Sequence, residues 1–201
     1  FMKDKTSSTS NTLLLSDTPN NSHTIWLMVT EKDFVLPFSR FESGGFLITI
    51  AEVEDAQRAW GDGIVKIATA HNNGGDYVDI ATQHVEQLYA YDLSEVLFKP
   101  TMASIDQFRP TFESALSYFV ASNGVCEEDN GFAIKGWTAV RFENSGIIIN
   151  KLNAIAMGNY FFTGKDGAET KVEYTFGYIR DGLSNLRIVL HHSSLPASSK
   201  N

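Results

Sequence analysis

The chain contains a single cysteine, Cys126, among its 201 residues. An internal disulfide is therefore impossible, and the fold has to be held together by a packed core. A composition of 43% hydrophobic and 20% charged residues is typical of a globular chain of this length. The sequence thus predicts one domain of ordinary size, with room for a tail.

Positive charge is also scarce, because 16 Lys and Arg stand against 24 Asp and Glu, giving a formal net charge of -8. Binding to phosphate backbones or anionic lipids needs a basic surface. No apolar run in the sequence is long enough to span a bilayer. We therefore expect neither a nucleic-acid partner nor a membrane partner.

Motifs that bind metals are missing as well. A zinc site needs three or four ligands that converge on one point, yet the sequence has neither an HxH pair nor a CxxC pair. The adjacent His191 and His192 fall on a predicted strand, where neighbouring side chains point to opposite faces. We expect no metal cofactor, with zinc or manganese as the alternative. The five histidines are His23, His71, His84, His191 and His192.

The N-terminal part differs in composition from the rest of the chain. Residues 1–45 begin with a run rich in Ser, Thr and Asn, which favours a tail or linker. Residues 24–38 are more apolar and can dock on the domain or on a partner. The domain is predicted over residues 46–197, followed by a short tail at 198–201.

Three helices are predicted in the first part of the domain. Thr49 and Glu52 fit a capping box, and apolar residues at helical spacing continue to about residues 71–75. A second helix is predicted over about 77–89. A third follows Pro110, which can occupy the first helical position. Gly61 and Gly63 weaken the first helix and indicate that another backbone or a ligand comes close.

From residue 131 onward the pattern changes to strands separated by turns. Helices followed by strands indicate an α+β fold. We expect a long, curved antiparallel sheet wrapped around the three helices, a cone whose open end suits a small ligand. The predicted strands are "EVLFK" at 95–99, then "GFAIKGW", "AVRFENSGIIIN", "NAIAMGNYFFT", "KVEYTFGYIR" and "LRIVLHHSS".

The order of these elements resembles the nuclear transport factor 2-like (NTF2-like) fold, and within it the association domain of calcium/calmodulin-dependent protein kinase II. Over residues 50–196 the amino-acid sequence itself resembles the iota-class carbonic anhydrases more closely still. The phrases that carry this resemblance include "AWGDGIVKIA", "LYAYD", "VLFKPT", "FRPTFESALSYFV", "AMGNYFFT" and "LRIVLHHSSLP".

This resemblance implies the reversible hydration of carbon dioxide to bicarbonate. It also implies a homodimer with one cone-shaped pocket per subunit, in a plastid or in a secreted or periplasmic setting. The alternative is a non-catalytic association module of the same fold. An isomerase would want a carboxylate base in the pocket, whereas Glu143 and Glu173 are expected to point outward.

Strand alternation divides the polar end of the last predicted strand. Ile188, Leu190, His192 and Ser194 share the face that is more apolar at its start, and we assign that face to the cavity. His191 and Ser193 then point outward or toward a partner. A bulge in the strand would exchange the two faces, which makes Ser193 the alternative to Ser194.

Other candidate site residues carry hydroxyl groups. Pro100 stiffens the chain before Thr101, although this threonine can equally cap a turn. Tyr118 can bury its ring and keep its hydroxyl in a polar pocket, or simply pack in the core. By resemblance, hydroxyls at these positions line the iota-class pocket. The expected catalytic residues are Thr101, Tyr118 and Ser194; His192, a candidate proton acceptor, lines the pocket with Ser193, Tyr160 and Tyr174.

Overall fold

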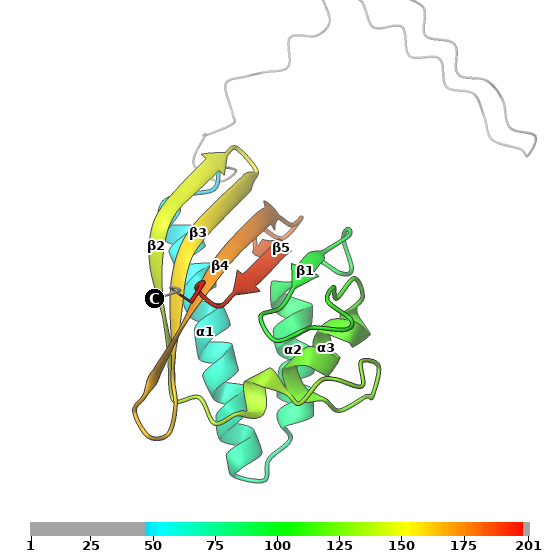
Figure 1. The fold of residues 1–201 in the computed structure, drawn as a ribbon. Helices are drawn as coiled ribbons and strands as arrows, with labels where there is room; N and C mark the ends of the chain where they lie inside the picture. The colour runs from blue at the N-terminus through cyan, green and yellow to red at the C-terminus, as the bar shows by residue number, and fades with distance from the viewer. Residues whose placement is uncertain (1–46, 199–201) are drawn as a thin grey trace, which may run out of the picture. The chain divides into compact units, whose positions relative to one another are not determined.

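A computed structural model describes residues 47–198 (Figure 1). The predicted tail 1–45, with the apolar segment 24–38 and His23, lies outside this range, as do residues 199–201 of the predicted tail 198–201. None of the described helices is both long and apolar enough to cross a membrane. The elements are α1 (Ile50–Asn72), α2 (Tyr77–Leu88), β1 (Leu97–Lys99), α3 (Phe112–Val120), the 3₁₀ helix η2 (Phe132–Ile134), β2 (Ala139–Asn150), β3 (Asn153–Thr163), β4 (Glu169–Arg180) and β5 (Leu186–Ser194).

The strands form one sheet in the order β1-β5-β4-β3-β2. The last four strands make the predicted antiparallel meander, and the short β1 adds a parallel edge to β5. The α+β class is thereby confirmed. The strand predicted from "GFAIKGW" is wrong, because residues 132–134 form a 3₁₀ turn between Gly131 and Gly136, which both have positive φ.

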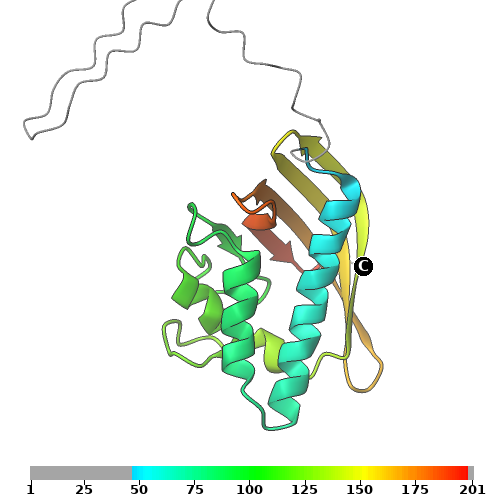
Figure 2. The ribbon, with the colours of Figure 1, turned by 180° about the vertical axis from the view of Figure 1, so that it is seen from behind.

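The three helices lie against one face of the sheet, as the two opposite views show (Figure 1, Figure 2). Helix α1 runs along β2, while α2 and α3 lie on the side of β1 and β5. Buried aromatic rings fill the space between helices and sheet, with Trp60 of α1 against Phe176 of β4 at 5.7 Å between ring centroids. The opposite face of the sheet carries no helix from the described part of the chain.

The helix ends follow the sequence closely. The Glu52 amide donates to Thr49 Oγ1 at 3.2 Å and the Thr49 amide donates back to the Glu52 carboxylate at 2.8 Å, so the capping box is confirmed. In α3 the N-cap is Thr111, whose side chain accepts from the Ser114 amide. Pro110 therefore lies before the helix, and its expected place at the first helical position is wrong.

Two glycines of α1 allow close approaches, although only at Gly61 is a backbone atom among the neighbours, as the sequence predicted; at Gly63 the neighbour is a side chain. A Cβ on Gly61 would lie 3.1 Å from the Cβ of Val140 in β2, and one on Gly63 would lie 2.1 Å from Nδ1 of His84 in α2. The neighbours are therefore a strand and a second helix. The two glycines thus allow α1 to pack closely against both the sheet and helix α2.

A bulge in β5 decides which of its side chains face the helices. Tyr178 of β4 pairs with Ile188, whereas the preceding Gly177 pairs with Leu190, so Val189 is an extra residue in β5. An extra residue reverses the alternation of every side chain beyond it. The end of β5 consequently presents the opposite face from the one expected for a regular strand.

Candidate active site

The centre of the site is a pair of hydroxyl groups from distant parts of the chain. Thr101 Oγ1 donates to Ser193 Oγ at 2.9 Å. Thr101 follows β1 and Ser193 lies near the end of β5, and the parallel pairing of Lys99 with His192 brings the two segments together. Ser193 is only 3% exposed. The pair therefore lies at the inner surface of the sheet.

The bulge in β5 overturns the predicted assignment of its faces. His191 and Ser193 point inward and are buried, whereas His192 is exposed and Ser194 hydrogen-bonds to the Glu173 carboxylate at 3.1 Å. The expectation that His192 and Ser194 face the cavity is therefore wrong. His192 therefore lies on the opposite face of β5 from the Thr101–Ser193 pair, and no hydrogen bond joins its side chain to that pair in the described residues.

The hydroxyl of Tyr160 in β3 lies beside this pair. Burial raises the pKa of Tyr160, and the neighbouring hydroxyls of Ser193 and Thr101 act in the opposite direction. The same hydroxyl lies 3.4 Å from Nε2 of His191. Tyr160 thus joins the hydroxyl cluster, which we define as Thr101, Tyr118, Tyr160 and Ser193.

Tyr118 of α3 contributes the fourth hydroxyl. Its ring stacks on Phe132 at 5.5 Å and meets Phe98 edge-on at 5.9 Å. Burial and the neighbouring Tyr160 raise its pKa, while a backbone hydrogen bond at Met102 opposes this shift. Tyr118 is therefore a neutral hydroxyl at neutral pH.

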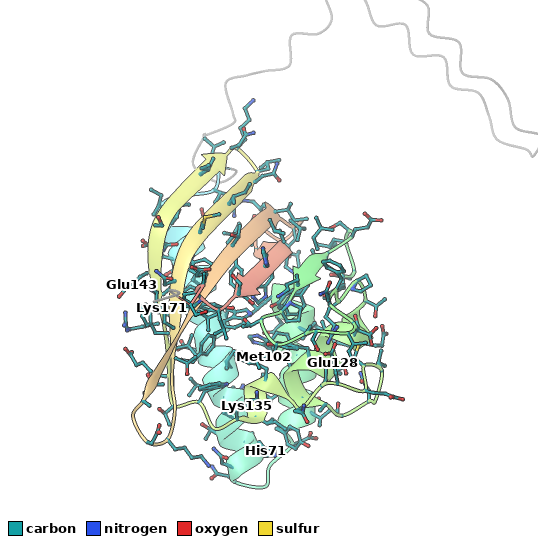
Figure 3. All side chains as sticks on the ribbon, in the orientation of Figure 1. His71, Met102, Glu128, Lys135, Glu143 and Lys171 are labelled. Carbon is teal, nitrogen blue, oxygen red and sulfur yellow. The ribbon has the colours of Figure 1, made fainter. Side chains whose placement is uncertain are left out.

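A small cavity of about 90 Å³ adjoins the hydroxyl cluster at Tyr118. Met102, Glu128 and Lys135, labelled in Figure 3, line it from three separate segments. The cavity is roomy enough for a few water-sized molecules. Water can therefore reach the hydroxyl cluster through this cavity, which polar side chains line in part.

Tyr174 contributes its ring to the site but directs its hydroxyl elsewhere. It pairs with Ser193 across β4 and β5, and its ring lies 5.3 Å from that of Tyr160. Its hydroxyl donates to Asn144 Oδ1 at 2.6 Å and accepts from Gln57 at 3.1 Å. Burial raises the pKa of Tyr174 to about 12. Tyr174 is thus a wall of the site rather than a member of the hydroxyl cluster.

The buried polar groups behind Tyr160 were not predicted from the sequence. His191 packs face to face with Phe98 at 4.5 Å and edge-on to Phe176 at 4.3 Å. Its Nδ1 lies 2.7 Å from the Tyr89 hydroxyl, which accepts from the indole N–H of Trp60 at 3.0 Å. The signal for this inward histidine was Gly177, since a glycine within a strand often marks a bulge.

The loop after Thr101 is held by one carboxylate. Glu128 accepts hydrogen bonds from the amides of Ser104, Ile105 and Asp106 at 2.8, 3.0 and 2.8 Å. These bonds, with the Ser104 hydroxyl as the largest cause, lower the pKa of Glu128 to about 2. The carboxylate therefore stays charged at neutral pH and stabilises the loop that leads from the cluster.

A larger groove lies outside the hydroxyl cluster. It measures about 550 Å³, and its lining, which includes Leu97, Phe108, Leu190 and His192, is mainly apolar. No member of the hydroxyl cluster contributes to it. The small substrate of the expected reaction is a poor match for this groove.

Within residues 47–198, no group of three or more His, Cys, Asp or Glu side chains is placed to hold a metal ion. The exposed Glu143, with Lys171 on the neighbouring part of the sheet, lies on the outer face (Figure 3). Glu173 is likewise exposed, as the sequence predicted for both glutamates. Neither Glu143 nor Glu173 can therefore serve the hydroxyl cluster as a base.

Comparison with known proteins gives a consistent family. The model of the metal-independent carbonic anhydrase family matches residues 51–195. A metal-independent carbonic anhydrase from Nostoc sp. (strain PCC 7120) is 41% identical over 152 residues, which are 74% of each chain.

One solved structure shows the same likeness, and a second is reported beside it. The cyanobacterial iota-carbonic anhydrase in complex with bicarbonate has a TM-score of 0.74 and 39% identity, covering 76% of this chain and 95% of that one. A protein described as a calcium/calmodulin-dependent protein kinase II association domain, from Xanthomonas campestris, has a TM-score of 0.46 and 21% identity, covering 75% and 87%. The match over residues 51–195 and the 41% identity show that the chain belongs to the metal-independent carbonic anhydrase family.

Proposed function

We propose that this chain hydrates carbon dioxide reversibly to bicarbonate at the hydroxyl cluster of Thr101, Tyr118, Tyr160 and Ser193. The observation that carries the proposal is the 2.9 Å contact between the half-buried Thr101 and the buried Ser193, at the inner surface of the sheet. Family membership supplies the reaction, and a solved relative is a complex with bicarbonate. Ser193 takes the catalytic place that strand alternation had given to Ser194.

The reaction joins a water oxygen to the carbon of carbon dioxide. One C=O π bond breaks, its electrons move onto oxygen, and one water proton leaves to solvent through the cavity beside Tyr118. Hydroxyl groups suit this change because each can accept from water and donate to a developing bicarbonate oxygen. Because the site holds both reactants in near-attack geometry, much of the entropy loss of a bimolecular encounter occurs on binding, before the chemical step. The buried rings around the cluster favour the neutral substrate over water.

The activity is tested by stopped-flow hydration of carbon dioxide with the full chain after exhaustive treatment with a chelator. We expect turnover to persist without added metal. Activity that disappears and returns only with zinc or manganese would reject a metal-independent site. A protein without hydration activity that forms large assemblies by light scattering would instead support the association module.

Two isosteric variants test the cluster itself. Thr101→Val and Tyr118→Phe each remove a hydroxyl and little volume, and we expect each to lower kcat/KM at least about tenfold. His192→Gln, on the outer face, is the matched control and should retain full activity. Full activity in both cluster variants would place the reaction elsewhere.

A homodimer is proposed on the outer face of the sheet. Ile148, Ile155 and Met157 are 69%, 47% and 57% exposed there, and these adjacent side chains form an apolar patch that helices leave uncovered within the described residues. Exposed apolar patches of this kind commonly mark an interface between proteins. Sedimentation equilibrium should give a dimer for the wild-type chain and a monomer for Ile155→Lys. A wild-type monomer at all concentrations would contradict the proposal.

A further inference from the structure

A continuous line of buried polar groups leads from α1 to the hydroxyl cluster. Trp60 Nε1 lies 3.0 Å from the Tyr89 hydroxyl, which lies 2.7 Å from His191 Nδ1, and His191 Nε2 lies 3.4 Å from the Tyr160 hydroxyl. None of these four side chains is more than 2% exposed. Bulk water therefore has no part in choosing the direction of their hydrogen bonds.

The direction is set at the tryptophan end. An indole N–H is a donor only, so the Tyr89 oxygen accepts it. The hydrogen of Tyr89 then needs an acceptor, and within the described residues its remaining partner is His191 Nδ1. The reverse direction would leave this buried hydrogen without an acceptor, which native structures avoid.

The histidine transmits this direction to Tyr160. A neutral imidazole carries hydrogen on one nitrogen only, so an accepting Nδ1 leaves the hydrogen on Nε2, where it donates to the Tyr160 oxygen. Burial, followed by the nearby His192 and His84, holds the pKa of His191 well below its ordinary value, which keeps the ring neutral. The Phe98 and Phe176 rings pack on the imidazole and hold its orientation.

The hydrogen of Tyr160 is then directed to the Thr101 and Ser193 side. Thr101 already donates to Ser193. A hydroxyl oxygen accepts two hydrogen bonds at most. The Ser193 and Thr101 hydroxyls both neighbour Tyr160 and lower its pKa, so one of these two oxygens accepts the Tyr160 hydrogen. In either case Thr101 donates onward to Ser193, and the Ser193 hydrogen is left to donate to a ligand.

We propose that Trp60, Tyr89 and His191 are positioning residues that order these hydrogen bonds, so that Ser193 presents a donor to an anionic oxygen of bicarbonate. The identity of this anion rests on the proposed function. Donors that are oriented before the charge develops stabilise it without reorganisation. Because carbon dioxide is neutral, this ordering stabilises bound bicarbonate more than bound carbon dioxide.

The direct test is nitrogen NMR of the full chain labelled with ¹⁵N-histidine, at neutral pH. We expect His191 to show a protonated Nε2 and an unprotonated Nδ1, with its resonances identified by their loss in His191→Gln. A protonated Nδ1, or a doubly protonated ring, would overturn the proposal.

Two variants test the effect on the anion. Trp60→Phe removes the donor that sets the direction, and Tyr89→Phe removes the hydrogen that it directs. Each should mix the His191 tautomers and raise KM for bicarbonate in the dehydration assay about tenfold, while KM for carbon dioxide stays unchanged. Trp137→Phe is the matched control, since that indole donates to the Phe132 carbonyl at 2.8 Å, outside the chain of contacts.

An unchanged bicarbonate KM in a folded Tyr89→Phe protein would overturn the proposal even if Trp60→Phe does not fold. Equal changes in both KM values would indicate a general structural defect and would also overturn it. Wild-type protein without hydration activity, but with the hydrogen of His191 on Nε2, would reject the proposed function and support the ordered direction of the hydrogen bonds.

Discussion

Ser193 and Ser194 are adjacent in the sequence and face opposite sides of the sheet. Ser193 accepts from Thr101 on the inner face at 2.9 Å, whereas Ser194 bonds Glu173 on the outer face at 3.1 Å. The bulge at Val189 determines this arrangement. Two serines with the same chemistry thus have different neighbours.

This relationship gives a paired mutational prediction. Ser193→Ala removes the donor nearest to the proposed anion and should lower kcat/KM about 100-fold, the usual effect of deleting one such donor. Ser194→Ala should leave activity unchanged. Both are measured by stopped-flow hydration, with circular dichroism to verify folding. Greater damage from Ser194→Ala would restore the assignment made from regular alternation.

Gly158 of β3 lies opposite a second bulge. The β2 residues Asn144 and Gly146 pair with Gly158 and Met157, so Ser145 is the extra residue. A Cβ on Gly158 would lie 2.1 Å from the Glu143 carbonyl oxygen. We expect Gly158→Ala to lower the free energy of unfolding by at least about 2 kcal/mol, because backbone must shift.

Gly146→Ala is the matched control for this substitution. A Cβ there meets nothing within 4 Å. Urea unfolding of the two variants should therefore differ clearly. Similar stability for both would mean that the bulge in β2 yields easily.

Acid should destabilise the domain through two buried histidines. Burial without a partner for Nε2 lowers the pKa of His84 to about 3, and burial also lowers that of His191. In the unfolded chain both take up a proton near their ordinary pKa of about 6.5. Stability is therefore retained above that pH and lost as the pH falls toward 3, by about 2 kcal/mol per histidine between pH 7.5 and 5.

Comparison of urea unfolding at pH 7.5 and pH 5 measures this loss. His84→Gln should remove the contribution of one of the two histidines to the stability difference between pH 7.5 and pH 5, which is about half of what the pair contributes. This expectation holds whatever the stability of the variant at pH 7.5. An undiminished difference in His84→Gln would show that this histidine is not the group responsible.

Glu128 supports the loop after Thr101 with both carboxylate oxygens. Glu128→Gln replaces one acceptor oxygen by a donor, so we expect faster amide hydrogen exchange at Ile105 and Asp106 and a lower turnover. Glu127→Gln changes the neighbouring, exposed carboxylate and is the control. Unchanged exchange in Glu128→Gln would show that the loop is held by other contacts.

The strand boundaries were predictable from sequence because apolar alternation and turn residues mark them directly. The predicted ranges 139–150, 153–163 and 186–194 are those of β2, β3 and β5. The face of Ser193 was not predictable by alternation, since one extra residue at Val189 reverses it. Gly177 supplied a local hint, because a glycine within a strand often marks a bulge. In the structure a Cβ at this position would lie 2.9 Å from Cβ of Leu190.

The contacts behind the hydroxyl cluster depend on tertiary packing alone. Tyr89 and His191 are 102 residues apart, and neither carries a motif that points to the other. Each is typical of a core position when it is considered separately. Their pairing emerges only when β5 enters the sheet with its bulge in place.

The parallel pairing of β1 with β5 also orders the assembly of the site in time. β5 is the last strand, so during synthesis Thr101 leaves the ribosome well before Ser193, its partner 92 residues later. A nascent chain that lacks β5 has neither Ser193 nor His191. Activity at the proposed site therefore requires β5 to be in place beside β1, so that hydration activity would report the docking of this strand.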